Sequence, residues 1–138
     1  MTLPYTLKQT TDLQQLGKQV AATGKPLLLM FSQDECAFCI KLKNEVIEPM
    51  LQNRAYRERL IMRELMIDEN ATLVDFNGRT TAGGKLFEHY GMVVTPTVIL
   101  VDSTGREIAR RQTGVNTIEM YGWYLDEAID AAVAALAQ

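Results

Sequence analysis

The chain has 138 residues, of which 47% are hydrophobic and 22% are charged. This balance is typical of a water-soluble globular protein, and the length fits one domain over residues 1–138, with residues 1–10 as an N-terminal extension. The net charge of -3 offers no basic surplus for phosphates, so nucleic acids and anionic membranes are poor candidate partners. A core of this size can be stable without a disulfide or a bound metal, so the two cysteines, Cys36 and Cys39, are expected to have a chemical role.

Two features of the sequence bear on the location of the protein. The longest apolar run covers only residues 26–31, which is too short to cross a bilayer. The first residues lack the basic and then apolar layout of a secretory signal. Two locations therefore stay open: the cytoplasm, or an exported compartment reached with a signal that has been removed.

The first half of the chain alternates helical and strand patterns. Apolar residues at helical spacing predict the helices, and continuous apolar runs predict strands buried on both faces. The predicted elements are a helix over 11–22, a strand over 27–31, a helix from Cys36 to Met50 that Pro49 kinks or ends, a short helix over 53–59 and a strand over 60–67. The order of strand, helix and strand favours parallel pairing of the two strands.

The second half combines a surface insertion, a hairpin and a final helix. The predicted elements are a polar, glycine-bearing insertion over 75–85, a short helix ending near 89–91, strands over 97–101 and 107–112 joined by a turn at 102–105, and a helix from Thr117. On the last helix, Tyr121, Trp123 and Tyr124 are expected to pack on the sheet, with an exposed partner surface as the alternative.

The cysteine pair lies where the first buried strand passes into a helix. A spacing of three places both sulfurs on one helix face, close enough to form a disulfide. The partial positive charge at a helix N-terminus stabilises a thiolate at the first cysteine. Cys36 is therefore predicted to be the attacking sulfur. Cys39, one turn further and more buried, is predicted to resolve the mixed disulfide.

Two other interpretations of the pair are less favoured. Two structural thiols can lie three residues apart by chance, but a strand-to-helix position is typical of redox pairs. A structural zinc site needs four ligands, and His89 is the only other soft candidate. We interpret His89 as a surface or helix-end residue, so no metal site is expected.

Several segments between residues 25 and 114 carry a family resemblance. They are residues 25–31, the Cys36-Ala37-Phe38-Cys39 motif, residues 66–68, residues 90–97 and a hairpin that closes at Gly114. In these segments the chain resembles thioredoxin-fold proteins. The insertion, Thr95-Pro96-Thr97 and the turn at 102–107 are most similar to periplasmic thioredoxin-like thiol:disulfide interchange reductases of the SoxW type.

The resemblance implies an α/β fold of the thioredoxin type. Helices would flank a central mixed sheet of about four to five strands, with an N-terminal helix and an insertion before a cis-proline loop. It also implies a periplasmic location with the signal peptide removed, and the cytoplasm is the alternative.

The resemblance further implies that the Thr95–Pro96 bond is cis and that this loop packs against the sulfurs. From the residues alone an ordinary trans proline at the start of a strand is favoured. A cis proline offers no N–H and leaves the Thr95 backbone free to pair with an extended substrate beside Cys36. Thr95 and Pro96 are thus candidate substrate-binding residues.

The motif departs from the common thioredoxin pattern. Glu35 stands where a tryptophan is usual, Ala37 and Phe38 replace Gly-Pro, and Met30 replaces a buried acid six residues before the first cysteine. These departures argue against recognition by a standard thioredoxin reductase. Glu64, in the neighbouring strand, is a candidate substitute for the acid, although a strand-edge carboxylate in water is the favoured interpretation.

Charges near the motif bear on the direction of electron flow. Asp34 and Glu35 oppose the helix dipole and disfavour a thiolate at Cys36. Lys41 and Lys43 act the other way, but they lie further along the helix and are expected to be solvated. A strong oxidant needs a very stable thiolate, so a reducing or intermediate potential is predicted.

The predicted function is that of a monomeric thiol-disulfide oxidoreductase that reduces protein disulfides through Cys36 and Cys39. An upstream thiol electron donor would reset the pair, and no bound cofactor is expected. The alternative is a metallochaperone or redox-gated binding module that holds a soft ion such as Cu(I) on the two thiolates. The motif has no adjacent histidine or methionine ligand, which favours the enzyme.

Overall fold

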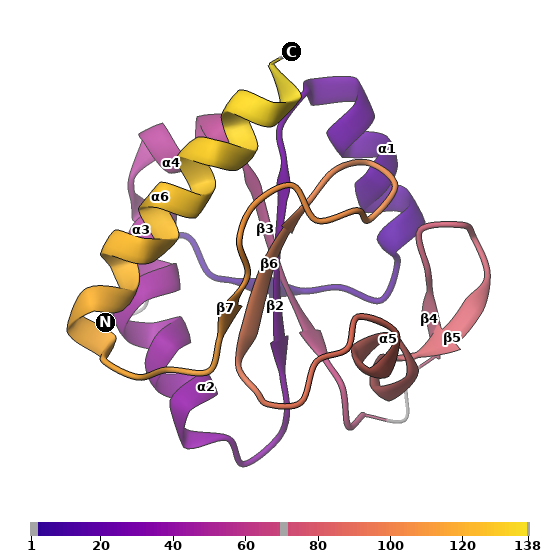
Figure 1. Ribbon diagram of the computed structural model, residues 1–138, viewed down its shortest axis with the longest axis horizontal. Helices are drawn as coiled ribbons and strands as arrows, with labels where there is room; N and C mark the ends of the chain where they lie inside the picture. Colours follow the sequence, from indigo (N-terminus) through magenta and orange to yellow (C-terminus); the bar gives the residue numbers. More distant parts are fainter. Residues whose placement is uncertain (1–2, 70–71, 138) are drawn as a thin grey trace.

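The computed structural model describes residues 3–69 and 72–137. At its centre lies a five-stranded mixed sheet (Figure 1). The strand order is β1-β3-β2-β6-β7. The strands are β1 (Lys8–Gln9), β2 (Leu27–Ser32), β3 (Ile61–Met66), β6 (Thr97–Val101) and β7 (Gln112–Thr113). Strands β1 and β2 run parallel to β3, whereas β6 is antiparallel to β2 and β7 is antiparallel to β6. The predicted parallel pairing of the two central strands is confirmed.

Helices cover both faces of this sheet (Figure 1). On one side lie α1 (Leu13–Thr23) and α5 (Gly83–His89). On the other side lie α2 (Ala37–Leu42), the π-helical turn η1 (Lys43–Ile47), α3 (Glu48–Gln52), α4 (Arg54–Arg59) and α6 (Ile118–Leu136). Within residues 3–69 and 72–137, no helix is both long enough and apolar enough to cross a membrane.

Strand β2 is apolar along its whole length because each of its faces meets a separate core. Leu28 and Met30 pack with α2 and α6, while Leu27, Leu29 and Phe31 pack with α1 and α5. All of these side chains are fully buried. Successive side chains on a strand point to opposite faces, so burial on both sides requires the unbroken apolar run. This strand carries the chain into the cysteine motif.

The helical run after the cysteine motif continues past Pro49, which we expected to kink or end it. The backbone N–H of Glu48 donates to the carbonyl of Lys43, five residues earlier, within the η1 turn. Proline lacks the N–H that an α-helix needs at that point, and a π-helical turn rearranges the hydrogen bonds around it. Helix α3 therefore extends to Gln52.

Two strands differ from the sequence-based prediction. The N-terminal extension contributes β1, whose two exposed polar residues give no apolar pattern. The predicted antiparallel pairing of 107–112 with β6 is confirmed at its two ends, where Glu107 bridges Val101 and Gln112 pairs with Val98. The prediction of one continuous strand is wrong, because β7 contains only Gln112–Thr113. Between these points Arg111 bonds the Glu107 carboxylate at 2.6 Å and the Tyr90 carbonyl at 2.8 Å, which holds the segment away from a regular ladder.

The predicted insertion over 75–85, together with the three residues before it, forms regular structure that its polar sequence did not predict. Strands β4 (Thr72–Val74) and β5 (Thr80–Ala82) form a separate antiparallel hairpin. Asp75 closes its turn by accepting the backbone N–H groups of Asn77 and Arg79, both at 2.9 Å. Helix α5 then begins at Gly83, inside the predicted insertion.

The aromatic residues of α6 divide into one buried side chain and two exposed ones. Tyr121 is buried in the core, as expected, and burial raises the pKa of its phenol. The prediction for Trp123 and Tyr124 is wrong, because they are 56% and 49% exposed and pack against each other. The buried stripe follows positions 121, 125, 128, 129 and 132, which leaves positions 123 and 124 facing outward.

The turn that follows β6 depends on one carboxylate. Asp102 accepts the Thr104 backbone N–H at 2.9 Å, the Thr104 hydroxyl at 2.7 Å and the Arg106 backbone N–H at 3.1 Å. Burial alone would raise the pKa of Asp102, but these hydrogen bonds and the Arg106 charge lower it below its usual value.

Asp102→Ala is expected to lower the free energy of unfolding by about 1–2 kcal/mol at neutral pH, because three donors lose a charged acceptor. A lowered folded-state pKa stabilises the fold above the unfolded value, about pH 4, and this contribution is lost as the pH falls through the folded pKa. The difference in free energy of unfolding between the wild-type protein and the variant, measured with urea, should therefore become smaller in acid. A difference that stays constant from neutral pH into acid would contradict this role.

Candidate active site

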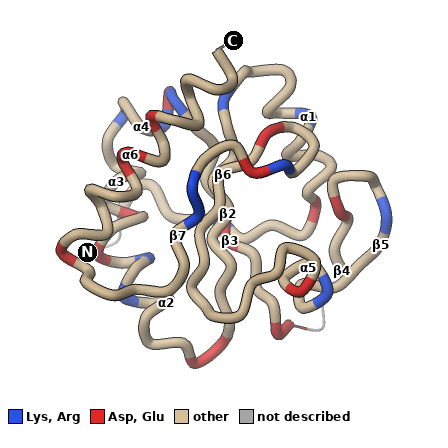
Figure 2. Tube along the Cα trace, viewed as in Figure 1, with Lys and Arg blue, Asp and Glu red and all other residues tan. Residues whose placement is uncertain are grey.

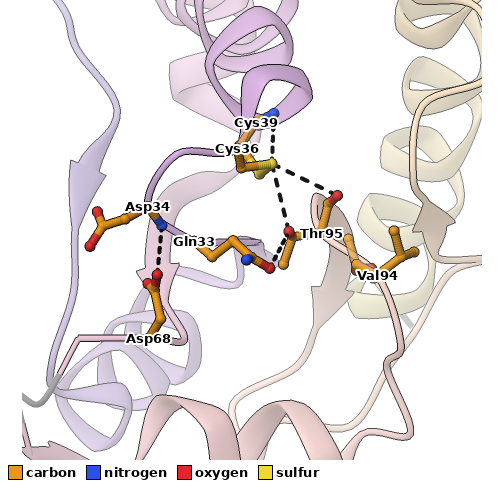
Figure 3. The surroundings of a disulfide bond; sticks show 8 residues. Gln33, Asp34, Cys36, Cys39, Asp68, Val94 and Thr95 are labelled. Carbon is orange, nitrogen blue, oxygen red and sulfur yellow. Dashed lines mark hydrogen bonds between the residues drawn. A yellow bond between two sulfur atoms is a disulfide. The ribbon is translucent and has the colours of Figure 1, made fainter.

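The two cysteines form a disulfide at the start of α2, at the edge of the sheet where β2 ends (Figure 3). Their Cα atoms lie 5.2 Å apart. Cys36 is the N-cap residue, and its Sγ accepts the backbone N–H of Cys39 at 3.2 Å. Cys39 is only 3% exposed, whereas Cys36 is half-buried. An incoming molecule therefore reaches the Cys36 sulfur more easily, and that sulfur already faces a helix N–H donor.

The turn that delivers Cys36 is attached to the end of β3. The backbone N–H of Asp34 donates to Asp68 Oδ2 at 2.9 Å (Figure 3). Glu35, the next residue, has a left-handed backbone with a φ of 56°. The Asp68 carboxylate thus fixes the path of the chain immediately before the first cysteine.

The loop before β6 lies against the Cys36 sulfur. The Thr95–Pro96 peptide bond is cis, and Pro96 is buried. Thr95 Oγ1 lies 3.6 Å from Cys36 Sγ, and the Thr95 carbonyl oxygen lies 3.9 Å from the same sulfur (Figure 3). The structure therefore brings Thr95 to Cys36 across 59 positions of the sequence. The Thr95 hydroxyl also donates to Gln33 Oε1 at 2.8 Å.

Three acidic residues lie in the segments beside the motif. Asp34 and Glu35 are both exposed, and Asp68 lies at the end of the neighbouring strand. Figure 2 shows these acidic segments in the turn before α2 and after β3. Their negative charge disfavours a Cys36 thiolate, while the N–H groups at the start of the helical run favour one.

Glu64 lies in the core, which contradicts the favoured prediction of a solvated strand-edge carboxylate. It is 4% exposed, and Lys43 Nζ donates to its Oε1 at 3.1 Å. The prediction that Lys43 is solvated is also wrong, since its side chain is only 30% exposed. Glu64 pairs in register with Met30, which is fully buried, so it faces the side of the sheet that α2 covers. A carboxylate there needs a partner, and Lys43 supplies it.

The other motif residues face solvent. Ala37 is exposed, and Phe38 is 56% exposed. Further apolar side chains are exposed on the same helix and directly before Thr95: Ile40 at 58%, Val93 at 87% and Val94 at 40%. Exposed apolar groups on both segments that adjoin a reactive sulfur are suited to contact another protein.

Two residues of the site were not identified from the sequence. Gln33 bonds Thr95, and Asp68 bonds the turn before Cys36. Gln33 comes directly after β2 and Asp68 two residues after β3, and a polar residue at such a strand end is the signal that could have selected them. Among the described residues, no group of three or more histidine, cysteine or acidic side chains is placed to hold a metal ion.

A dithiol motif at a helix start, opposite a proline loop on a mixed sheet, is the arrangement of the thioredoxin fold. The model of the thioredoxin-like domain family matches residues 13–129. The chain therefore belongs to the thioredoxin-like domain family. No match is found among curated proteins.

Solved structures share this fold at low sequence identity. An oxidoreductase named DsbH is 18% identical, with a TM-score of 0.64 and coverage of 94% of this chain and 91% of that chain. Thioredoxin of Malassezia sympodialis is 18% identical, with a TM-score of 0.63 and coverage of 96% of both chains. Thioredoxin of Fasciola hepatica is 17% identical, with a TM-score of 0.61 and coverage of 90% and 97%. The predicted thioredoxin fold is confirmed, and together with the cysteine pair it supports thiol-disulfide oxidoreductase chemistry.

Proposed function

We propose that the protein is a reductase of protein disulfides that cycles between a Cys36–Cys39 dithiol and disulfide. The observation that carries this proposal is the half-buried Cys36 sulfur, which accepts a helix N–H and lies 3.6 Å from Thr95 Oγ1. The buried Cys39 lies beside it in a disulfide. This pairing provides both an attacking and a resolving sulfur.

The reaction has two displacements. The Cys36 thiolate attacks one sulfur of the substrate disulfide, whose S–S bond breaks and releases one substrate thiolate. The deprotonated Cys39 then attacks Cys36 Sγ and releases the second substrate thiolate. Two electrons pass to the substrate, the Cys36–Cys39 bond forms, and the released thiolates take protons from water. An upstream dithiol donor returns the two electrons.

Thr95 and Pro96 are proposed to bind the substrate, together with exposed apolar side chains on the flanking segments. An extended substrate segment beside Cys36 would pair with the Thr95 backbone, since Pro96 has no N–H to offer. Phe38, Val93 and Val94 expose apolar surface on the flanking segments. Asp34, on the same side, favours substrates that carry a basic residue near the disulfide.

The reducing direction is supported by the charges around Cys36. Asp34, Glu35 and Asp68 place negative charge near a sulfur that a strong oxidant would need to hold as a stable thiolate. Ala37 and Phe38 between the cysteines carry no charge that would offset it. Glu64 is kept as a candidate tuning residue, because its partner Lys43 donates its backbone N–H to the carbonyl of Cys39.

The proposal also covers the cellular location of the protein, its oligomeric state and its electron donor. We place the protein in the periplasm as a monomer served by a thiol donor, on the resemblance to SoxW-type reductases, with the cytoplasm as the alternative. The experiment that tests the proposed direction is the reduction potential of the Cys36–Cys39 couple, measured by equilibration with glutathione. A reducing or intermediate value supports a reductase, and a value typical of dedicated oxidases overturns it.

A further inference from the structure

Gln33 lies beside Thr95 and Cys36 and has no role in the function proposed above. Its Oε1 accepts the Thr95 hydroxyl at 2.8 Å, and the same hydroxyl oxygen lies 3.6 Å from Cys36 Sγ (Figure 3). A threonine hydroxyl has one proton to donate. Gln33 and the Cys36 sulfur are therefore alternative acceptors for that proton.

The redox state decides between these acceptors. In the disulfide, the Cys36 sulfur is uncharged and a weak acceptor, so the shorter bond to the Gln33 amide oxygen holds the proton. After reduction, the Cys36 thiolate is a charged acceptor, and hydrogen bonds to charged groups are roughly twice as strong. Rotation of the hydroxyl about its Cβ–Oγ1 bond then directs the proton to the sulfur.

The amide of Gln33 can support Thr95 in both states. A glutamine side chain carries an acceptor oxygen and a donor NH₂ group on the same carbon. When the Thr95 hydroxyl turns to the thiolate, the amide of Gln33 can turn over and donate to the Oγ1 lone pair. The chain of donors then runs from Gln33 through Thr95 to Cys36, and each bond polarises the next.

We propose that Gln33 is a positioning residue that directs the Thr95 hydroxyl to the Cys36 thiolate in the reduced protein and holds it away in the disulfide. The inference rests on the proposed reductase function and deepens it, because it names a residue that sets the thiolate population.

The other charged groups near Cys36 are the same in every variant compared below. They are Asp34 and Glu35 in the same turn, Asp68 after β3, and Lys41 and Lys43 in the helical run. The segment 92–96 carries no charged residue. The combined effect of these five charged residues on the Cys36 sulfur is therefore common to all the variants.

The test uses Gln33→Glu in the reduced full-length protein. A carboxylate accepts but cannot donate, so it keeps the Thr95 hydroxyl from the thiolate and adds a negative charge. The pKa of Cys36 should rise, and alkylation of Cys36 by iodoacetamide at neutral pH should slow about three- to tenfold. The readouts are the alkylation rate against pH and the thiolate absorbance near 240 nm.

A double-mutant cycle with Thr95→Val separates the hydrogen bond from the added charge. In the Thr95→Val background the charge remains but the hydroxyl is absent, so the Gln33→Glu effect should be at least about twofold smaller. The neutral variant Gln33→Met should slow alkylation only when Thr95 is present. Equal effects of Gln33→Glu with and without the hydroxyl would overturn the proposal.

This outcome is distinguishable from a failure of the proposed function. If Cys36 still forms mixed disulfides with substrates but the cycle shows no coupling, only the role of Gln33 is lost. If Cys36 forms no mixed disulfide in any background, the reductase proposal itself is wrong.

Discussion

Cys39→Ser is expected to leave Cys36 joined to its protein substrate in a mixed disulfide that survives non-reducing electrophoresis. The serine hydroxyl cannot displace a disulfide sulfur at neutral pH, so the second displacement stops after the first has occurred. Turnover of a disulfide-bonded protein should fall to the rate of the free donor thiol. Mass spectrometry of the trapped band should locate the bond at Cys36, the half-buried sulfur of the pair.

Cys36→Ser is the matched control, and it should trap no substrate. The remaining sulfur, Cys39, is 3% exposed, so an external disulfide cannot reach it without local opening. Trapping through Cys39 would reverse the assigned roles. If neither variant traps a partner while the reduced wild-type protein binds one Cu(I) through both cysteines, the metallochaperone alternative replaces the reductase.

Lys43→Met is expected to cause the largest loss of stability, about 2 kcal/mol. The change leaves the Glu64 carboxylate in the core without the ammonium that bonds it at 3.1 Å. Removing one partner of a buried ion pair leaves an uncompensated charge, which costs more than the pair itself contributes. The partial exposure of Lys43 admits water to the vacated space and holds the loss below the range of about 3–5 kcal/mol that is usual for fully buried pairs. Urea unfolding measures it.

Two variants make this stability prediction specific. Lys41→Met removes an exposed lysine from the same helical run and should change the free energy of unfolding by less than about 0.5 kcal/mol. Lys43→Met combined with Glu64→Leu removes both charges and should recover most of the stability. If Lys43→Met is as mild as Lys41→Met, the pair contributes no more than a surface contact.

The central strands could be predicted from the sequence because their patterns have a single physical explanation. An apolar run as short as 27–31 is typical of a strand buried on both faces, and β2 meets one core on each side. Strand β1 could not be predicted in this way. It has two exposed polar residues, and its stability comes from pairing with β3 rather than from its own composition.

The site was only partly predictable because some of its contacts join distant residues. The cysteine spacing and the proline loop follow from local sequence and the family resemblance. Gln33 meets Thr95 across 62 positions, and Lys43 meets Glu64 across 21 positions. The period-two alternation with Leu60 and Met62 does place Glu64 on a buried face, but the alternation cannot name the partner that makes burial of a carboxylate tolerable.

The reduction potential of the Cys36–Cys39 couple tests the proposed reductase most directly. The acidic turn and Asp68 disfavour a stable thiolate, so we predict a potential between about -270 and -180 mV, the span from thioredoxin to protein disulfide isomerase. Equilibration with defined glutathione ratios, followed by thiol labelling, gives the value. A potential near -120 mV, that of a dedicated periplasmic oxidase, would contradict the account.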